Sequence, residues 1–157
     1  MIKHLQKILL ITFSLVIHTF TFGQNEYFTQ LNTTNGLSIN TIKHITQDYL
    51  GFMWIGTQDG ICKYDGAKVQ IYRNTEKNLF SYGDNDISYI FEDSNLNLWV
   101  CTTHGGIAKY DRHNDRFINY NHVNGTKIKN IHINCVEEIA GKKLVFGTQS
   151  GLSFFDL

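Results

Sequence analysis

The feature that most constrains this chain is a motif that returns at a period of about 45 residues, the range of stacked structural repeats. The first copy, residues 51–65, reads GFMWIGTQDGICKYD, and the second, residues 97–111, reads NLWVCTTHGGIAKYD. A weaker third copy, LVFGTQSGLSFFD, occupies residues 144–156. Self-similarity at a fixed period of this length indicates one supersecondary unit that is stacked on copies of itself.

Each copy contains short apolar segments that turn residues separate. In the first copy these segments are 42–46, 53–57, 61–64 and 69–72. Each is too short for a helix and is bounded by Asp, Asn or Gly, so we expect four β-strands. The second segment is apolar on both faces and must be covered on both sides. The pattern predicts an all-β fold of β-propeller blades, about three four-stranded blades in an incomplete ring, with a β-sandwich as the alternative.

The period also predicts how the chain is divided. We assign residues 1–23 to a secretory signal peptide, 24–36 to a lead-in segment, 37–82 and 83–126 to two blades, and 127–157 to a partial third blade. The signal peptide is predicted because Lys3 and Lys7 precede an apolar run that ends near Gly23. A membrane anchor is the alternative for this run, and no later segment is long enough to span a membrane.

The lead-in segment contains an extended stretch, residues 27–31, ahead of the first blade. In a complete ring we expect this stretch to pair with the last blade and close the circle. The repeat is still running at residue 157, so we expect a truncated gene or a partial sequence.

Residues at equivalent places in the copies are expected to build the blades rather than a binding or catalytic site. Turn pairs such as Asp65-Gly66 supply the left-handed conformations that tight hairpins need. The tryptophans are expected in the core between blades, and the tyrosines at blade edges. The full set is Asn40, Asp48, Trp54, Gly56, Gly60, Tyr64, Asp65, Asn85, Asp93, Trp99, Gly106, Tyr110, Asp111, Asn130, Gly147, Gly151 and Asp156.

The chemically reactive residues form no catalytic pattern. We interpret Cys62, Cys101 and Cys135 as buried free thiols, with a Cys62–Cys101 disulfide as the alternative that export permits. The histidines lack zinc-site spacing, and we expect them to be solvated loop residues. Those that follow the signal peptide are His44, His104, His113, His122 and His132.

Carboxylates also fail to form a recognisable site. The run that begins at Asp93 resembles a calcium loop but has Leu98 where such loops require glycine. Adjacent pairs such as Glu137-Glu138 point to opposite faces of a strand. With 14 basic and 14 acidic residues, the chain also lacks the basic excess that nucleic-acid binding needs. We therefore expect no catalytic residue, metal, cofactor or nucleic acid, and leave the binding residues unassigned.

The motif of the first copy resembles the two-component-regulator propeller repeat. It reads Asn40-Thr41-Ile42 with Asp48 six residues further on, and then Gly51 to Asp65 with the Trp-Ile-Gly-Thr run. The resemblance covers nearly all of residues 28–157. It implies the periplasmic sensor of a hybrid two-component system of the kind common in Bacteroidetes, in a longer protein with a membrane span and a histidine kinase.

The same resemblance implies that the sensor recognises oligosaccharides released from glycans. No kinase motif is present in this sequence, so we expect a non-catalytic sensor portion. An exported propeller lyase or glycosidase and a protein-interaction scaffold are the alternatives. The expected partners are an oligosaccharide, other propeller blades or a second copy of the chain.

Overall fold

The computed structural model describes residues 4, 29–74, 83–120, 132–140 and 143–157. It separates into two units, Met1–Gln30 and Leu31–Leu157. Within the predicted signal peptide only residue 4 is described. His122 and Asn130 lie outside the described residues. Among the described residues, no helix has the length and apolar character needed to cross a membrane.

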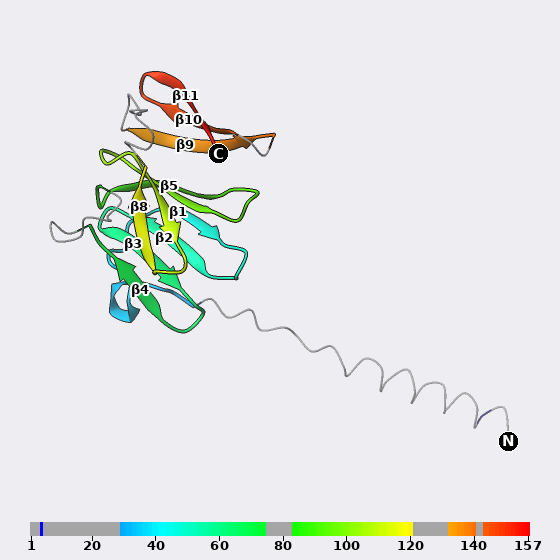
Figure 1. The fold of residues 1–157 in the computed structure, drawn as a ribbon. Helices are drawn as coiled ribbons and strands as arrows, with labels where there is room; N and C mark the ends of the chain where they lie inside the picture. The colour runs from blue at the N-terminus through cyan, green and yellow to red at the C-terminus, as the bar shows by residue number, and fades with distance from the viewer. Residues whose placement is uncertain (1–3, 5–28, 75–82, 121–131, 141–142) are drawn as a thin grey trace. The chain divides into compact units, whose positions relative to one another are not determined.

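The second unit is built from three antiparallel sheets, as Figure 1 shows. In each sheet the strands are paired in chain order. The all-β prediction is confirmed, and the strands of the first copy lie where the sequence placed them. The third sheet has three described strands. The strands are β1 (Ile42–Gln47), β2 (Met53–Thr57), β3 (Gly60–Tyr64), β4 (Val69–Tyr72), β5 (Ile87–Glu92), β6 (Leu98–Thr102), β7 (Ile107–Asp111), β8 (Arg116–Asn119), β9 (Ile133–Ile139), β10 (Lys143–Thr148) and β11 (Gly151–Asp156).

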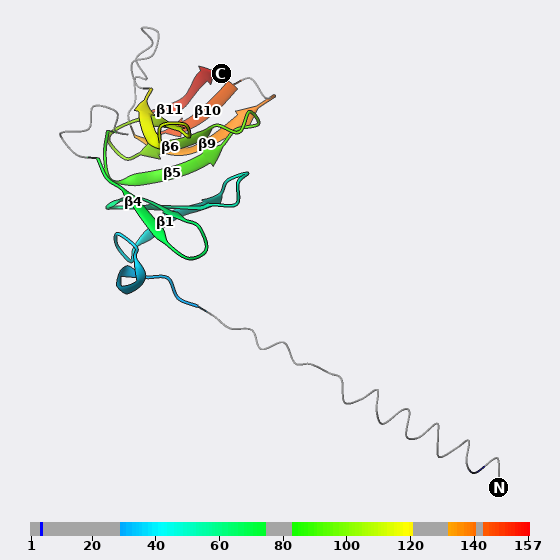
Figure 2. The ribbon, with the colours of Figure 1, turned by 60° about the horizontal axis from the view of Figure 1, so that its bottom comes forward.

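The sheets stack face to face with a hydrophobic core in each seam. The first core joins Trp54 of β2 to residues of the second sheet such as Ile87 and Leu98. The second core joins Trp99 of β6 to residues of the third sheet such as Phe146. All five residues of β6 are buried, so the prediction that a middle strand is covered on both faces is confirmed. Figures 1 and 2 both place β5 between β1 and β9.

Each first strand is interrupted by a β-bulge at the same place. In the second sheet Ile87 pairs with Thr102 and Tyr89 with Cys101, so Ser88 is an extra residue. The same shift makes Lys43 the extra residue of β1 and Asn134 that of β9. A bulge breaks the two-residue alternation of side chains along a strand.

The bulge explains the spacing of the buried residues in these strands. Ile87 and Ile90 are three residues apart, and in a regular strand they would point to opposite faces. Because of the bulge, both lie in the first core with at most 1% exposure. Gly56 allows this close packing, since a Cβ atom there would lie 2.7 Å from Ile87 Cγ2.

The lead-in segment packs on the outer face of the first sheet. Leu31, ahead of the short 3-10 helix η2 (Thr33–Asn35), packs against the cluster that Leu37 forms with Ile55 and Cys62. Residues 29–31 form no strand, and 27–28 lie outside the described residues. Ring closure by this stretch therefore stays a prediction.

Candidate functional site

The repeated aspartate and tryptophan are joined by a buried hydrogen bond. Trp54 Nε1 donates to Asp48 Oδ2 at 2.9 Å. The other oxygen, Oδ1, accepts from the backbone N–H groups of Leu50 and Phe52 at 3.1 and 2.9 Å. The carboxylate thus holds both the β1–β2 turn and the indole ring, a role that needs two acceptor oxygens.

The second sheet repeats this arrangement. Trp99 Nε1 donates to Asp93 Oδ2 at 2.8 Å, and Asp93 Oδ1 accepts from the backbone N–H of Asn97 at 2.8 Å. These protein donors engage the oxygens that a calcium loop would offer to the ion. In the third sheet Val145 pairs with Glu137 where Trp99 pairs with Phe91 in the second.

In the first and second sheets, charged side chains of the following sheet bind the turn between the first and second strands. Arg112, in the hairpin after β7, donates to Asp48 Oδ2 at 2.7 Å and to Glu92 Oε2 at 2.8 Å. Glu92 Oε1 in turn accepts from the backbone N–H of Tyr49 at 3.1 Å. In the next seam Glu138 Oε2 accepts from the backbone N–H of Ser94 at 2.6 Å. This shared role of Glu92 and Glu138 as acceptors for the preceding turn was not predicted from the sequence, because the first sheet has glutamine at the equivalent place.

Burial sets the ionisation of these carboxyl groups. Burial opposes the charged form of Asp48, but hydrogen bonds from Arg112, Trp54 and the Phe52 backbone together lower its pKa below the usual value. The pKa of Glu92 is raised, mainly because burial disfavours its charge. In the cluster of Arg112, Asp48 and Glu92, the two terminal nitrogens of the guanidinium donate to two acids, while the buried Arg112 Nε has no hydrogen-bond partner among the described residues.

The repeated asparagines and threonines hold the chain at the ends of the first and second strands. Asn40 Oδ1 accepts from the backbone N–H of Thr33, and Asn85 Oδ1 accepts from that of Asn74. Each amide thus fastens the segment that leads into its sheet. The last residue of each second strand is a threonine whose hydroxyl donates to the carbonyl of the hairpin glycine, in the pairs Thr57–Gly60, Thr102–Gly106 and Thr148–Gly151.

The remaining repeated residues lie at hairpin turns, except Gly147 within β10 and Asp156 at the end of β11. Gly60 and Gly106 have φ angles of 96° and 79°, which glycine adopts without strain. Asp65 caps its hairpin by accepting from the backbone N–H groups of Ala67 and Lys68. Asp111 accepts from those of His113 and Asn114, Gly147 pairs with Cys135, and Asp156 forms an exposed ion pair with Lys143.

The two repeated tyrosines occupy different environments. Tyr64 is partly buried, and its hydroxyl donates to the Gly66 carbonyl at 2.7 Å. Tyr110 is 4% exposed in the first core, so its predicted place at a blade edge is wrong. Its ring lies 4.7 Å from that of Trp54. Strand β3, which carries Tyr64, and strand β7 are both inner strands of their sheets, so neither tyrosine lies on an edge strand.

A hydroxyl cluster surrounds Asp115 beside this core. Asp115 Oδ1 accepts hydrogen bonds from the hydroxyls of Tyr72 and Tyr110, and its Oδ2 accepts from Gln70 at 2.9 Å. Burial, followed by the hydrogen bond to Asp115, raises the pKa of Tyr110 to about 12. Asp115 has a φ of 50°, which a residue other than glycine rarely adopts. The cluster therefore fastens β4 to the hairpin of the next sheet.

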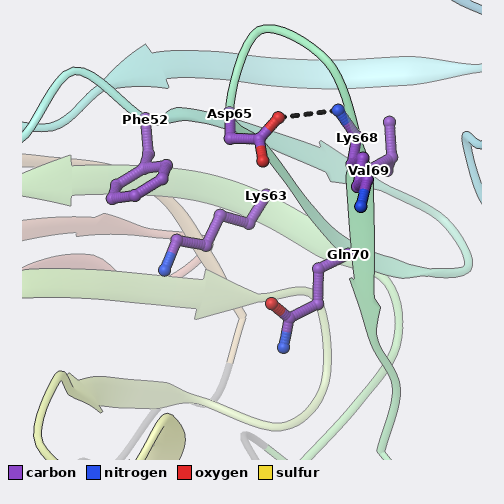
Figure 3. Close-up of a pocket in the computed structure, with 6 residues that line it drawn as sticks. All are labelled: Phe52, Lys63, Asp65, Lys68, Val69 and Gln70. Carbon is purple, nitrogen blue, oxygen red and sulfur yellow. Dashed lines mark hydrogen bonds between the residues drawn. The ribbon is translucent and has the colours of Figure 1, made fainter.

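A pocket of about 460 Å³ opens on the first sheet, and Figure 3 shows the residues that line it. One of them, Gln70, also belongs to the cluster around Asp115. Lys63 Nζ lies 4.2 Å from the centre of the Phe52 ring and donates to the Tyr110 hydroxyl at 3.3 Å. Two lysines, Lys63 and Lys68, and one carboxylate, Asp65, contribute charge to the pocket. The lining residues are Phe52, Lys63, Asp65, Lys68, Val69 and Gln70.

The pocket recurs on the second sheet. A cavity of about 350 Å³ there includes Asn97, Lys109 and Asp111, which correspond to Phe52, Lys63 and Asp65. Lys109 Nζ lies 5.7 Å from the Trp99 ring. A lysine next to an aromatic surface and hairpin amides can hold a small polar molecule. Among the described residues, no group of three or more His, Cys, Asp or Glu side chains could hold a metal ion.

Histidine and cysteine depart from the sequence predictions at two places. His44 lies on β1, where its Nδ1 accepts from the Ile90 backbone N–H at 3.3 Å, and burial lowers its pKa. It is therefore not a solvated loop residue. All three cysteines are free, so the Cys62–Cys101 disulfide is wrong. Cys62 and Cys101 are buried as expected, but Cys135 is exposed.

Stacked antiparallel sheets with contacts between successive first strands are the blades of a β-propeller. Residues 36–59 match the family model described as "Two component regulator propeller". This segment of the chain therefore carries the two component regulator propeller repeat.

A stretch of 59 residues is 37% identical to Histidine kinase P4 of Formosa agariphila, and spans 38% of this chain and 4% of the kinase. The fold is similar to the extracellular domain of BT4673 from B. thetaiotaomicron, which is assigned as a hybrid two component system. That structure has a TM-score of 0.62 at 22% identity, over 83% of this chain and 19% of that one. A second BT4673 structure, assigned as a one component system, has a TM-score of 0.60 at 22% identity over 82% of this chain and 16% of that one.

Proposed function

We propose that this chain is a ligand-recognition portion of a two-component signalling protein, and that it works outside the cytoplasm, in the periplasm. The observation that carries the proposal is the propeller-repeat match at residues 36–59 within a stack of three sheets. The chain would bind a ligand and pass the event on through the packing of its blades. It would perform no chemistry of its own.

We further propose an oligosaccharide as the ligand. Support comes from the two equivalent pockets, where Lys63 and Lys109 each lie beside an aromatic ring. Sugars present apolar C–H faces together with hydroxyl groups, and sites for such ligands combine aromatic surface with a few polar groups. The repetition of the pocket on successive sheets suits a ligand made of several sugar units.

Binding and turnover should be measured together on the purified chain. Calorimetry against a panel of neutral and acidic oligosaccharides should detect binding, while chromatography of the same samples should find no new product. Lys63→Gln tests the pocket, and Lys143→Gln, an exposed lysine of the third sheet, is its matched control. Product formation would identify an exported enzyme instead, and an absence of binding to the whole panel would overturn the proposed ligand class.

Assembly is a second candidate role, and exposed apolar residues of β11 favour it. Leu152 is 68% exposed and Phe154 is 63% exposed on the last described strand. Such side chains often mark a contact surface. Further propeller blades or a second copy of the chain would cover them. Light scattering after size-exclusion chromatography tests whether a second copy of the chain covers β11. This role requires a compact dimer, and Phe154→Glu should convert the dimer to a monomer.

A further inference from the structure

In the first seam, a carboxylate of the second sheet lies among a lysine and two tyrosines. Asp115 Oδ1 accepts from the hydroxyls of Tyr72 and Tyr110, the first at 2.6 Å. The Tyr110 hydroxyl in turn accepts from Lys63 Nζ at 3.3 Å. Burial opposes the charge of Asp115, but the two hydroxyls, Gln70 and the charge of Lys63 together lower its pKa. These side chains therefore form a site that holds an ionised carboxylate.

The second seam repeats the lysine and one of the tyrosines of this site. Lys109 corresponds to Lys63, and each ammonium lies over the repeated tryptophan of its sheet, 5.7 and 5.3 Å from the ring centre. Tyr120 corresponds to Tyr72 at the end of the fourth strand. Their rings lie 5.1 and 5.8 Å from the same two tryptophans. The second seam thus carries a cation and a hydroxyl in the arrangement that binds a carboxylate in the first.

The lysine and tyrosine of the second seam are available to a ligand. Among the described residues, Lys109 Nζ makes no hydrogen bond or ion pair, and the Tyr120 hydroxyl makes no hydrogen bond. Both side chains are partly buried, and together with Asn97 they line two cavities of about 350 and 400 Å³. We call Asn97, Lys109 and Tyr120 the Lys109 site. Phe155 lies where the first seam has Tyr110, so one hydroxyl is not repeated.

The charges around the Lys109 site favour an acidic ligand. The other charged side chains that line the two cavities have ion-pair partners: Asp111 with Arg116, Asp156 with Lys143, and Arg112 with Asp48. Within the described part of the chain, Lys109 is thus the charged lining residue that forms no ion pair. An ammonium group beside a hydroxyl donor matches a carboxylate, which accepts several hydrogen bonds and binds charged donors most strongly.

We propose that the Lys109 site binds the carboxylate of a sugar acid, so that the ligand is an oligosaccharide containing a uronic acid unit. The inference rests on the proposed oligosaccharide recognition and narrows the ligand to one that carries a carboxylate. The ligand carboxylate lies at Lys109 and Tyr120 as Asp115 lies beside Lys63 and Tyr72 in the first seam. The partly exposed Tyr120 ring offers an apolar surface to the C–H face of the sugar.

The test is calorimetry on the full chain with an oligogalacturonate and the neutral galacto-oligosaccharide of the same linkage and length. The two probes differ only in a carboxylate and a hydroxymethyl group. The wild type should bind the acidic probe at least about tenfold more tightly, the effect of one charge-assisted hydrogen bond. Lys109→Gln should remove this preference, and Lys109→Arg, which keeps the charge, should retain it. Tyr120→Phe should weaken the acidic probe by about tenfold.

Arg73→Gln is the matched control for the loss of charge. It removes one positive charge from an exposed ion pair with Asp59, outside both cavities, and should bind both probes as the wild type does. Equal weakening of the acidic probe by Lys109→Gln and Arg73→Gln would show a general charge effect and overturn the site. Glutarate, a dicarboxylate without a sugar ring, should bind more weakly than the oligogalacturonate. Equal binding of glutarate would overturn the sugar acid as the ligand.

Two further outcomes separate this inference from the proposed function. A wild type that binds the neutral probe as tightly as the acidic one would overturn the carboxylate site, while oligosaccharide recognition would stand. A wild type that binds neither oligosaccharide would overturn the proposed ligand class and the Lys109 site with it.

Discussion

Asparagine in place of Asp48 should destabilise the chain more than asparagine in place of Asp93. Both aspartates hold a turn and the indole of a buried tryptophan, but only Asp48 also accepts from Arg112. The Asp48 side chain is fully buried and that of Arg112 is 22% exposed. Asp93 instead accepts from the Asn97 side-chain amide at 2.9 Å, so Asp48→Asn loses an ion pair where Asp93→Asn loses a hydrogen bond from a neutral amide.

The magnitudes follow from the atoms that change. An amide keeps one oxygen for the turn but places an NH₂ group opposite Trp54 Nε1 and Arg112. A buried donor without an acceptor costs about 1–3 kcal/mol, and a lost charge-assisted hydrogen bond costs about 1.5–3 kcal/mol. We expect a loss of about 3–5 kcal/mol for Asp48→Asn and about 1–3 kcal/mol for Asp93→Asn, since only the first variant loses both.

Urea denaturation followed by tryptophan fluorescence measures both changes. The chain has 2 tryptophans, Trp54 and Trp99, and each lies beside one of the substituted aspartates. A double-mutant cycle of Asp48→Asn with Arg112→Gln measures the interaction energy of this ion pair. In a control cycle of Asp93→Asn with Arg112→Gln, the interaction energy should be close to zero. Equal losses of stability in Asp48→Asn and Asp93→Asn would refute the role assigned to Arg112.

Three further predictions concern packing, ionisation and thiol exposure. Trp54→Ala should lower the free energy of unfolding measured in urea by about 3–5 kcal/mol, because it leaves a cavity in the first core. The control Val145→Ala should lower it less, since Val145 is only partly buried. A Trp54→Ala variant as stable as the wild type would contradict the core assignment. Since burial lowers the His44 pKa from its ordinary 6.5, the unfolded state binds the proton more readily, so stability should fall as pH drops through 6.5 and level off below the folded pKa. His44→Gln should reduce that slope, and an unchanged slope would count against it. A thiol reagent should label Cys135 in the native protein and the buried Cys62 and Cys101 only after unfolding, with Cys135→Ser as control; rapid native labelling of Cys101 would be inconsistent with its burial.

The period and the apolar segments were sufficient to predict the strands and the face-to-face stacking. They succeeded because both depend on local patterns and on the need to cover a strand such as β6 on two sides. The bulge was also detectable, since Ile87 and Ile90 are three residues apart and cannot share a face of a regular strand. The equivalent segment of the first copy, residues 42–46, was predicted as a regular strand, so the bulge was not predicted.

Contacts between sheets could not be predicted in the same way. Arg112 reaches Asp48 across a seam, and no pattern along the chain marks which arginine does so. Tyr110 was misplaced because its strand position depends on how many strands follow it in the sheet. The lysine pockets also require the folded seam, since Lys63 lies near an aromatic ring of the next sheet.

The seam contacts couple each described blade to its neighbour, because the turn after a first strand contacts side chains of the next blade. The turn after β1 is completed by Glu92 and Arg112, and the turn after β5 is completed by Glu138, so each sheet is finished by the sheet that follows it in the chain. Folding in such a stack is coupled between nearest neighbours. Damage to a later blade should therefore loosen the blade before it, and a ligand that tightens one blade would stiffen its neighbour as well.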